Sequence, residues 1–188
     1  MLKHIKEFGK YVIIAGLKDA KIGKAEEFLE KIRKEKSSNV EIQFFDARCI
    51  AGWQHLYFAV LNALTAFKNG RNISKNLAVE VILYASAQRQ IRKALEKLGI
   101  KLETDKIALV IIGDKADDLK STLNTILCLA NAKRDDRVLE LVKGKIDVIR
   151  EIFGISDLEL ETVMKNGALE KALMDIVIER MALLVTQL

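Results

Sequence analysis

The chain has 188 residues, of which 50% are hydrophobic and 30% are charged, and its formal net charge is +5. This length suits one domain, and the apolar content is sufficient for a core, so an intrinsically disordered chain is excluded. The longest apolar run, residues 107–113, is much shorter than the roughly 20 residues that a membrane-spanning helix needs. The mildly basic charge permits an anionic partner without requiring one.

Features of the N-terminus and of the cysteines predict a cytoplasmic location. The first residues, MLKHIKEF, carry charges where a signal peptide would have an apolar stretch. Cys49 and Cys128 cannot form a disulfide framework, and neither belongs to a Cys-x-x-Cys motif or a Cys/His cluster. This cysteine usage is typical of a soluble protein in a reducing compartment.

The beginning of the chain predicts a strand–helix–strand unit. The β-branched run at residues 11–16 and the alternating start of residues 40–45 are typical of strands. Between them, the apolar positions of residues 22–36 fall on one face, which predicts an amphipathic helix. A strand–helix–strand order is a common unit of α/β proteins.

Three helices are predicted in the middle of the chain. Residues 51–67 are apolar nearly all round, which is typical of a buried central helix. Gly70 is placed to end this helix at its C′ position, and Ser74 is a good N-cap for the next helix, residues 75–85. A third helix at residues 88–98 carries basic residues on its outer face.

The rest of the chain predicts one strand followed by helices. Residues 107–112 are continuously apolar, which predicts a central strand covered on both faces. Helices are expected at residues 116–132, 137–153 and 168–188, and Ser156 opens a short helix with a capping box.

These elements predict an α/β fold. We expect a single mixed domain over residues 1–188, in which a small sheet of three or four strands is surrounded by seven or eight helices. The chain has no proline, so neither a proline-rich linker nor a cis-proline turn separates its parts.

Motifs for nucleotide, metal or nucleophilic chemistry are absent from the sequence. No glycine-rich phosphate loop follows the predicted strands, and the two histidines, His4 and His55, lack the spacing of metal ligands. We therefore predict no cofactor, no metal site and no catalytic residue.

Two polar residues, His55 and Glu80, fall in predicted apolar helices. His55 is either a histidine whose hydrogen bonds are satisfied by a neighbouring loop or a general base, although no nucleophile motif accompanies it. Glu80 has no cation at helical spacing. It therefore pairs with a basic side chain from elsewhere such as Arg89, binds a backbone N–H, or faces a site.

The segment from Lys68 to Asn76, KNGRNISKN, is the best candidate for an anion site. It combines three cations with amides, a hydroxyl and a predicted helix N-terminus. Helix N-termini attract anions through free N–H groups and the helix dipole, and phosphate contacts use these residue types. Arg89, Arg92 and Lys93 extend the patch if the two helices pack side by side; the alternative is a solvated loop with ordinary surface charges.

The last predicted helix has a wider apolar face than core packing needs. One stripe consists of Ala172, Leu173, Ile176 and Val177, and further apolar residues widen it: Ile178, Met181, Leu183, Leu184 and Val185. The surplus predicts a docking face for a partner.

An ordered series of motifs resembles a known family. It runs IAGWQHL at 50–56, GRNISKNL at 70–77, EVILYASAQRQI at 80–91, an alanine- and leucine-bearing segment at 94–100, and VIERMALL at 177–184. The series is similar to the kinase-binding regulatory subunit of the KEOPS complex, the family of the PRPK-binding protein (TPRKB), in its archaeal form. The resemblance covers most of the chain and is densest at residues 50–100.

The resemblance implies a small non-catalytic α/β protein that binds the small atypical kinase/ATPase of the KEOPS complex. That complex installs threonylcarbamoyl on the adenosine next to the anticodon of tRNAs that read ANN codons. Archaeal members of the family bind the 3′ CCA end of tRNA. The expected partners are therefore the kinase/ATPase subunit and tRNA, without a membrane or a small-molecule substrate.

The resemblance also assigns residues to these partners. The expected tRNA contacts are Arg71, Asn72, Ser74, Lys75, Gln88, Arg89, Gln90 and Arg92. Cations would bind phosphates, and the amides of Asn72, Gln88 or Gln90 would read base edges of a single strand. The C-terminal helix would dock the kinase through Leu173, Ile176 and Val177.

Two other functions stay open at this point. One is a purely protein–protein adaptor that regulates the kinase without touching tRNA. The other is an uncharacterised enzyme that uses His55 with Glu80.

Overall fold

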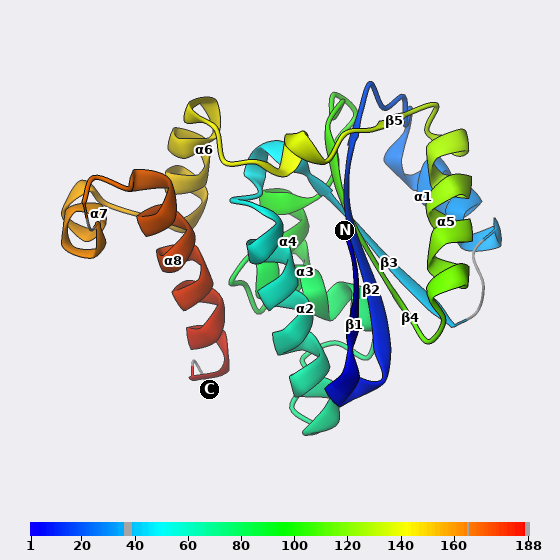
Figure 1. Ribbon diagram of the computed structural model, residues 1–188, viewed down its shortest axis with the longest axis horizontal. Coiled ribbons are helices and arrows are strands. Elements are labelled where there is room, and N and C mark those ends of the chain that lie inside the picture. Colours follow the sequence, from blue (N-terminus) through cyan, green and yellow to red (C-terminus); the bar gives the residue numbers. More distant parts are fainter. Residues whose placement is uncertain (36–38, 165, 187–188) are drawn as a thin grey trace. The chain divides into compact units, whose positions relative to one another are not determined.

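The computed structural model describes residues 1–35, 39–164 and 166–186 (Figure 1). Across these residues the chain forms eight α-helices and a five-stranded sheet, which confirms the predicted mixed α/β fold with a slightly larger sheet. The chain divides into two compact units. The sheet unit comprises Met1–Ala47 and Gly99–Val138, and the helical unit comprises Arg48–Leu98 and Leu139–Leu188. That both form a single domain stays a prediction.

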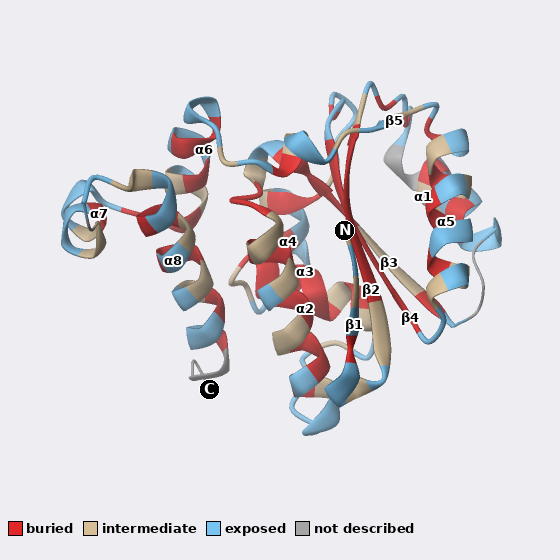
Figure 2. Cartoon of the chain, in the orientation of Figure 1, coloured by how far each residue is buried: buried red, intermediate tan, exposed pale blue. Residues whose placement is uncertain are grey.

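The sheet unit is antiparallel throughout. Its strands are β1 (Leu2–Ile5), β2 (Lys10–Lys18), β3 (Val40–Asp46), β4 (Ile107–Gly113) and β5 (Lys133–Arg134). The order is β1-β2-β4-β3. Strand β5 pairs with Leu17 and Lys18 of β2, after the segment of β2 that pairs with β1. Because β2 and β3 are both antiparallel to β4, they run parallel to each other with β4 between them. All seven residues of β4 are buried, as the apolar run predicted (Figure 2).

Two helices complete the sheet unit. They are α1 (Ala25–Glu35) and α5 (Ala116–Leu129), which lie side by side along the sheet (Figure 1). Their buried residues Phe28, Ile32 and Leu119 pack with the strand residues Phe44 and Leu109 in one hydrophobic cluster. The predicted helix 22–36 is shorter in the structure, and its position 36 lies outside the described residues.

Asp135 and Asp136, which directly follow β5, form a strap that is hydrogen-bonded to β2. The Asp135 N–H donates to the Gly16 carbonyl at 2.8 Å, and the Gly16 N–H donates to Asp136 Oδ1 at 3.0 Å. A Cβ on Gly16 would lie 2.5 Å from the Asp135 carbonyl oxygen, so only glycine allows the strap this close.

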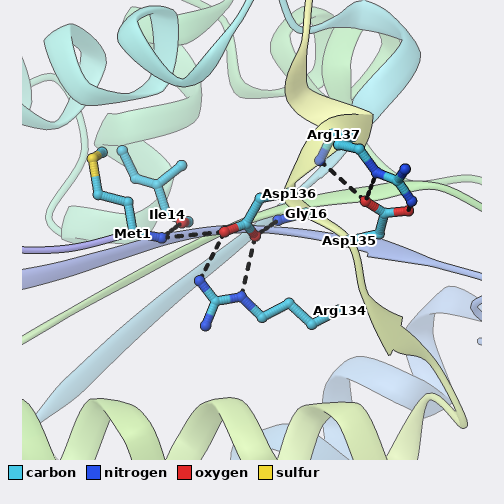
Figure 3. Close-up of polar contacts among 7 residues, drawn as sticks. All are labelled: Met1, Ile14, Gly16, Arg134, Asp135, Asp136 and Arg137. Carbon is cyan, nitrogen blue, oxygen red and sulfur yellow. Dashed lines mark hydrogen bonds and ion pairs between the residues drawn. The ribbon is translucent and has the colours of Figure 1, made fainter.

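Charged groups hold Asp136 in this strap (Figure 3). Arg134 binds both carboxylate oxygens at 3.2 and 2.8 Å, and the ammonium of Met1 lies 3.6 Å from Oδ2. Burial would raise the pKa of Asp136, but the hydrogen bonds from Arg134 and Gly16 outweigh it, so this pKa lies below its usual value.

Six helices form the helical unit. They are α2 (Trp53–Lys68), α3 (Leu77–Ala85), α4 (Ile91–Leu98), α6 (Lys143–Phe153), α7 (Asp157–Val163) and α8 (Leu169–Ala182). Over both units together, the chain also forms short 3₁₀ turns: η1 (Lys6–Phe8), η2 (Ala47–Cys49), η3 (Asp136–Leu139) and η4 (Leu183–Thr186). Helix α2 packs against α3 and α8, but Phe58 and Thr65 are exposed, so α2 is less completely buried than predicted.

The turn after α2 confirms the predicted role of Gly70. Gly70 has φ +64°, its N–H donates to the Phe67 carbonyl at 3.2 Å, and the Arg71 N–H donates to the Ala66 carbonyl at 2.9 Å. This pair of bonds is the Schellman motif, which satisfies the last carbonyls of a helix. The position of the Arg71 backbone is therefore set by the end of α2.

Two predicted caps had different outcomes. Ser156 caps α7 as expected, since its Oγ accepts the Glu159 N–H at 3.2 Å. Ser74 does not cap α3: the N-cap is Asn76, whose Oδ1 accepts the Val79 N–H at 2.9 Å. Both residue types are good N-caps, so their relative positions in the loop decide.

Two predicted helices have other boundaries in the structure. The helix expected at 137–153 begins at Lys143, because the preceding residues form η3 and an extended link. The helix expected at 168–188 continues as η4 after Ala182, and its positions 187–188 lie outside the described residues. None of the helices within the described ranges is long and apolar enough to cross a membrane.

Candidate functional site

The loop between α2 and α3, residues 71–76, carries two exposed cations. Arg71 follows the Schellman turn of α2, and Lys75 precedes the N-cap Asn76 of α3. Within the described residues, neither Arg71 nor Lys75 takes part in an ion pair. Both charges are thus available to an anionic ligand.

Glu80 of α3 is hydrogen-bonded to the backbone of this loop. It is 0% exposed, although it is charged and lies in the first turn of α3. Its carboxylate accepts the Ser74 N–H at 2.7 Å and the Ile73 N–H at 3.0 and 3.1 Å. Of the alternatives open from the sequence, the structure therefore shows the backbone N–H groups as its partners and does not place it in an open site.

Further hydrogen bonds close the loop on itself. The Asn72 Nδ2 donates to the Ser74 carbonyl at 3.0 Å, and the Asn76 N–H donates to Ser74 Oγ at 3.2 Å. Because Glu80 accepts the N–H groups of Ile73 and Ser74, these two donors are not free to bind a phosphate. The exposed side chains of Arg71 and Lys75 are the positive groups that an anion can contact at this loop.

The second predicted segment, Gln88 to Arg92, lies at the other end of α3. Helix α3 has nine residues, so the two segments are separated by about 13 Å of largely buried helix. The Gln88 Nε2 donates to the Ala87 carbonyl at 2.9 Å, and the Arg89 Nη1 lies 3.5 Å from the Leu184 carbonyl oxygen. Arg92 forms an exposed ion pair with Glu96 at 2.9 Å. The structure thus has two separate cationic segments. Arg89 and Arg92 have partners within the protein, whereas Arg71 and Lys75 form no ion pair within the described residues.

An aromatic row on α2 was missed from the sequence. The ring centroids of Trp53 and Tyr57 are 6.1 Å apart, those of Tyr57 and Phe58 are 6.2 Å apart, and Phe58 is 40% exposed. The apolar pattern of residues 51–67 indicated complete burial, which hid this exposed ring. Such a ring can stack a base of single-stranded RNA.

His55 is committed to structural hydrogen bonds. It is fully buried, its Nδ1 accepts the Ala51 N–H at 3.2 Å, and its Nε2 lies 2.7 Å from the Ala85 carbonyl oxygen. These partners require the neutral ring with its proton on Nε2. Burial lowers the pKa of His55 to about 4, although the bond to Ala85 opposes this shift. Neither nitrogen is available to a substrate as a general base.

The three side chains expected to dock the kinase point inward. Leu173, Ile176 and Val177 are 0%, 1% and 0% exposed and belong to a cluster with residues of α6 and α7. This corrects the predicted orientation of the helix, because a core position favours these apolar residues as much as a docking face does. The outer face of α8 instead carries Lys171, Asp175 and Glu179 and continues to the exposed Leu183 of η4.

Side chains that could bind a metal ion are dispersed in the part of the chain that the structure describes. No group of three or more His, Cys, Asp or Glu residues is close enough there to hold an ion. Neither of the two cysteines, Cys49 and Cys128, takes part in a disulfide within these ranges.

The fold and the candidate site describe a mixed α/β protein with a cationic loop on a buried support. Comparison with known proteins gives the family: the model described as kinase binding protein CGI-121 matches residues 20–184. The chain belongs to this family.

Two archaeal relatives agree with this family. The chain is 33% identical to the regulatory protein Cgi121 of Methanocaldococcus jannaschii over 116 residues, which cover 62% of this chain and 72% of the relative. It is 27% identical to the KEOPS complex subunit Cgi121 of Pyrococcus abyssi over 126 residues, which cover 67% of each chain.

Proposed function

We propose that the chain is a non-catalytic subunit of the KEOPS complex. In this role it binds the small atypical kinase/ATPase of the complex and recruits tRNA through the 3′ CCA end for threonylcarbamoyladenosine modification. The observation that carries the proposal is the match of residues 20–184 to a family described as kinase-binding, together with a relative named as a KEOPS subunit. Neither Cys49 nor Cys128 forms a disulfide within the described residues, and this fits a cytoplasmic location.

The commitment of His55 supports a non-catalytic role. The enzyme alternative needs His55 to exchange a proton with a substrate, whereas both of its nitrogens are bound to backbone groups in the interior. Glu80, its suggested partner in catalysis, is likewise bound to backbone N–H groups.

The cationic loop supports tRNA binding. The 3′ end of tRNA is single-stranded, so its recognition uses phosphate contacts with cations and stacking of bases on exposed rings. Arg71 and Lys75 supply the cations, and Phe58 and Gln90 supply an exposed ring and an exposed amide. On this proposal, affinity falls as salt rises.

Charge reversal at the loop tests this proposal. We expect Arg71→Glu with Lys75→Glu to weaken tRNA binding by at least about tenfold and to reduce the dependence of affinity on salt, because two phosphate contacts are lost. Fluorescence anisotropy with labelled tRNA over a salt series measures both quantities.

The matched control is Lys31→Glu with Lys34→Glu, two exposed lysines of α1 that give the same change in net charge. The control variant should bind tRNA nearly as well as the wild type. An equal loss in both variants would mean non-specific attraction to a basic surface. An unchanged affinity in the loop variant would favour the adaptor that regulates the kinase without touching tRNA.

A further inference from the structure

Among the residues that the structure describes, no cation forms an ion pair with the buried Glu80. Its side chain is 0% exposed, and its neighbours at helical spacing are Asn76, Leu77, Leu83 and Tyr84. An unpaired buried carboxylate is costly, so such a group persists where backbone donors compensate for the lost hydration. Here the compensation comes from the N–H groups of Ile73 and Ser74 and from the N-terminal end of α3.

These bonds fix the loop between its two cations. Arg71 is anchored on one side by the bond from its N–H to the Ala66 carbonyl at 2.9 Å. Lys75 lies between Ser74, which is held by Glu80 at 2.7 Å, and the N-cap Asn76. The carboxylate therefore holds the segment that sets the spacing of the two exposed charges.

The identity of the side chain matters for this role. An ionised carboxylate only accepts hydrogen bonds, so it can hold two neighbouring N–H groups at once. A glutamine of the same size presents one oxygen and one NH₂ group, and the NH₂ group opposes a backbone N–H. The carboxylate also occupies the N–H groups of Ile73 and Ser74, so these two donors cannot bind a phosphate.

We infer that Glu80 is a positioning residue for the RNA-binding loop: its buried carboxylate preorganises Arg71 and Lys75 for the phosphates of single-stranded RNA. A preformed loop loses less conformational freedom on binding, and this raises affinity without a direct contact between Glu80 and the RNA. The inference rests on the proposed function, since it names what orders the same site.

Glu80→Gln tests the inference. We expect this variant to bind tRNA about tenfold more weakly, with a smaller dependence of affinity on salt, while its affinity for the kinase is unchanged. The matched control is Ser86→Ala at the opposite end of α3, which removes a buried hydroxyl bonded to the Ile82 carbonyl at 2.7 Å. The control should keep the tRNA affinity of the wild type. Equal losses in both variants would reduce Glu80 to a general stabiliser of the helix and overturn the inference.

A double-mutant cycle separates this inference from the proposed function. If Glu80 acts through the two cations, Glu80→Gln should add little to the loss caused by Arg71→Glu with Lys75→Glu. Additive losses would overturn the positioning role and leave the proposed function standing. Absence of any loss from the charge reversal alone would overturn the proposed function itself.

Hydrogen exchange in the wild-type protein tests the hydrogen bonds between Glu80 and the loop without a variant that could fail to fold. The amides of Ile73 and Ser74 should exchange far more slowly than unprotected amides, because both donate to a buried carboxylate. Exchange at the unprotected rate would show that the loop opens freely, and the inference would fail.

Discussion

His55 links three helices of the helical unit through one side chain. Its Nδ1 accepts the Ala51 N–H before α2, its Nε2–H donates to the last residue of α3, and its ring centroid lies 5.7 Å from that of Phe153 in α6. Protonation at Nδ1 would place a proton against the Ala51 N–H and a charge in the interior. The neutral ring is therefore the form that the fold needs.

This requirement predicts acid sensitivity. The pKa of His55 is lowered from 6.5 to about 4 in the folded protein, so the unfolded chain binds the extra proton first. The contribution to stability is complete above pH 6.5 and is lost as the pH falls toward 4, by about 3 kcal/mol. Urea unfolding of the wild type at pH 7, 6, 5 and 4 should show this decline.

The variant His55→Gln isolates the effect. We expect the variant to be less stable than the wild type at pH 7, because it loses the packing of the His55 ring on Phe153. The glutamine side chain does not titrate between pH 4 and 7. Its free energy of unfolding should therefore vary less with pH than that of the wild type over this window. The same decline in both proteins would assign the acid sensitivity to other groups.

The polar residues His55 and Glu80 stand out in the sequence, but not all of their hydrogen-bond partners can be identified there. Two of the alternatives open from the sequence are confirmed by the structure. His55 has its hydrogen bonds satisfied by neighbouring backbone groups, and Glu80 binds backbone N–H groups. The donors to Glu80 come from six and seven residues earlier in the chain, outside helical spacing. Only the folded loop turns those N–H groups inward, so no residue pattern could identify them.

Among the helices and strands, those with strong sequence patterns were predicted correctly, whereas the strands with weak patterns, β1 and β5, were missed. The continuous apolar run of β4 and the Schellman glycine after α2 were both predicted. Strand β1 was missed because its Leu-Lys-His-Ile sequence mixes charges with apolar residues, as suits a sheet edge. Strand β5 is two exposed basic residues and exists only through its pairing with β2.

Helix α8 shows why an apolar stripe alone does not locate an interface. Its inner stripe fills a cluster with α6 and α7, and its outer face is charged. A wide apolar pattern fits core packing and docking equally well. If α8 docks the kinase as the proposed function requires, the contact falls to its charged outer face and Leu183, because the inner stripe is buried.

Two matched substitutions separate these roles. Leu173→Ala should lower the free energy of unfolding by about 2–5 kcal/mol, because it leaves a cavity in the core. Leu183→Ala removes a side chain that is 41% exposed, so it should cost little stability and weaken kinase binding by about fivefold or more.

Chemical denaturation and titration with the purified kinase measure both effects. The assignment of the two faces would be contradicted if Leu173→Ala kept its stability and lost kinase binding. It would also be contradicted if Leu183→Ala left kinase affinity unchanged.

At the scale of the whole molecule, the candidate functions fall on the helical unit. The cationic loop, the aromatic row, His55 and α8 all belong to it. The sheet unit is held by its own core and by the strap over Gly16. The division could not be predicted from the sequence, because each unit is built from two separate stretches of chain without a linker of distinctive composition between them.

The proposed function depends most on the recruitment of tRNA through its 3′ end. Binding of the wild-type protein to whole tRNA and to the same tRNA without its 3′ CCA, each at two salt concentrations, tests it most directly. Whole tRNA should bind at least about tenfold more tightly at both concentrations, because the stacking and phosphate contacts need the single-stranded end. Equal, weak and equally salt-dependent binding of both RNAs would contradict the claim and leave only a mildly basic surface.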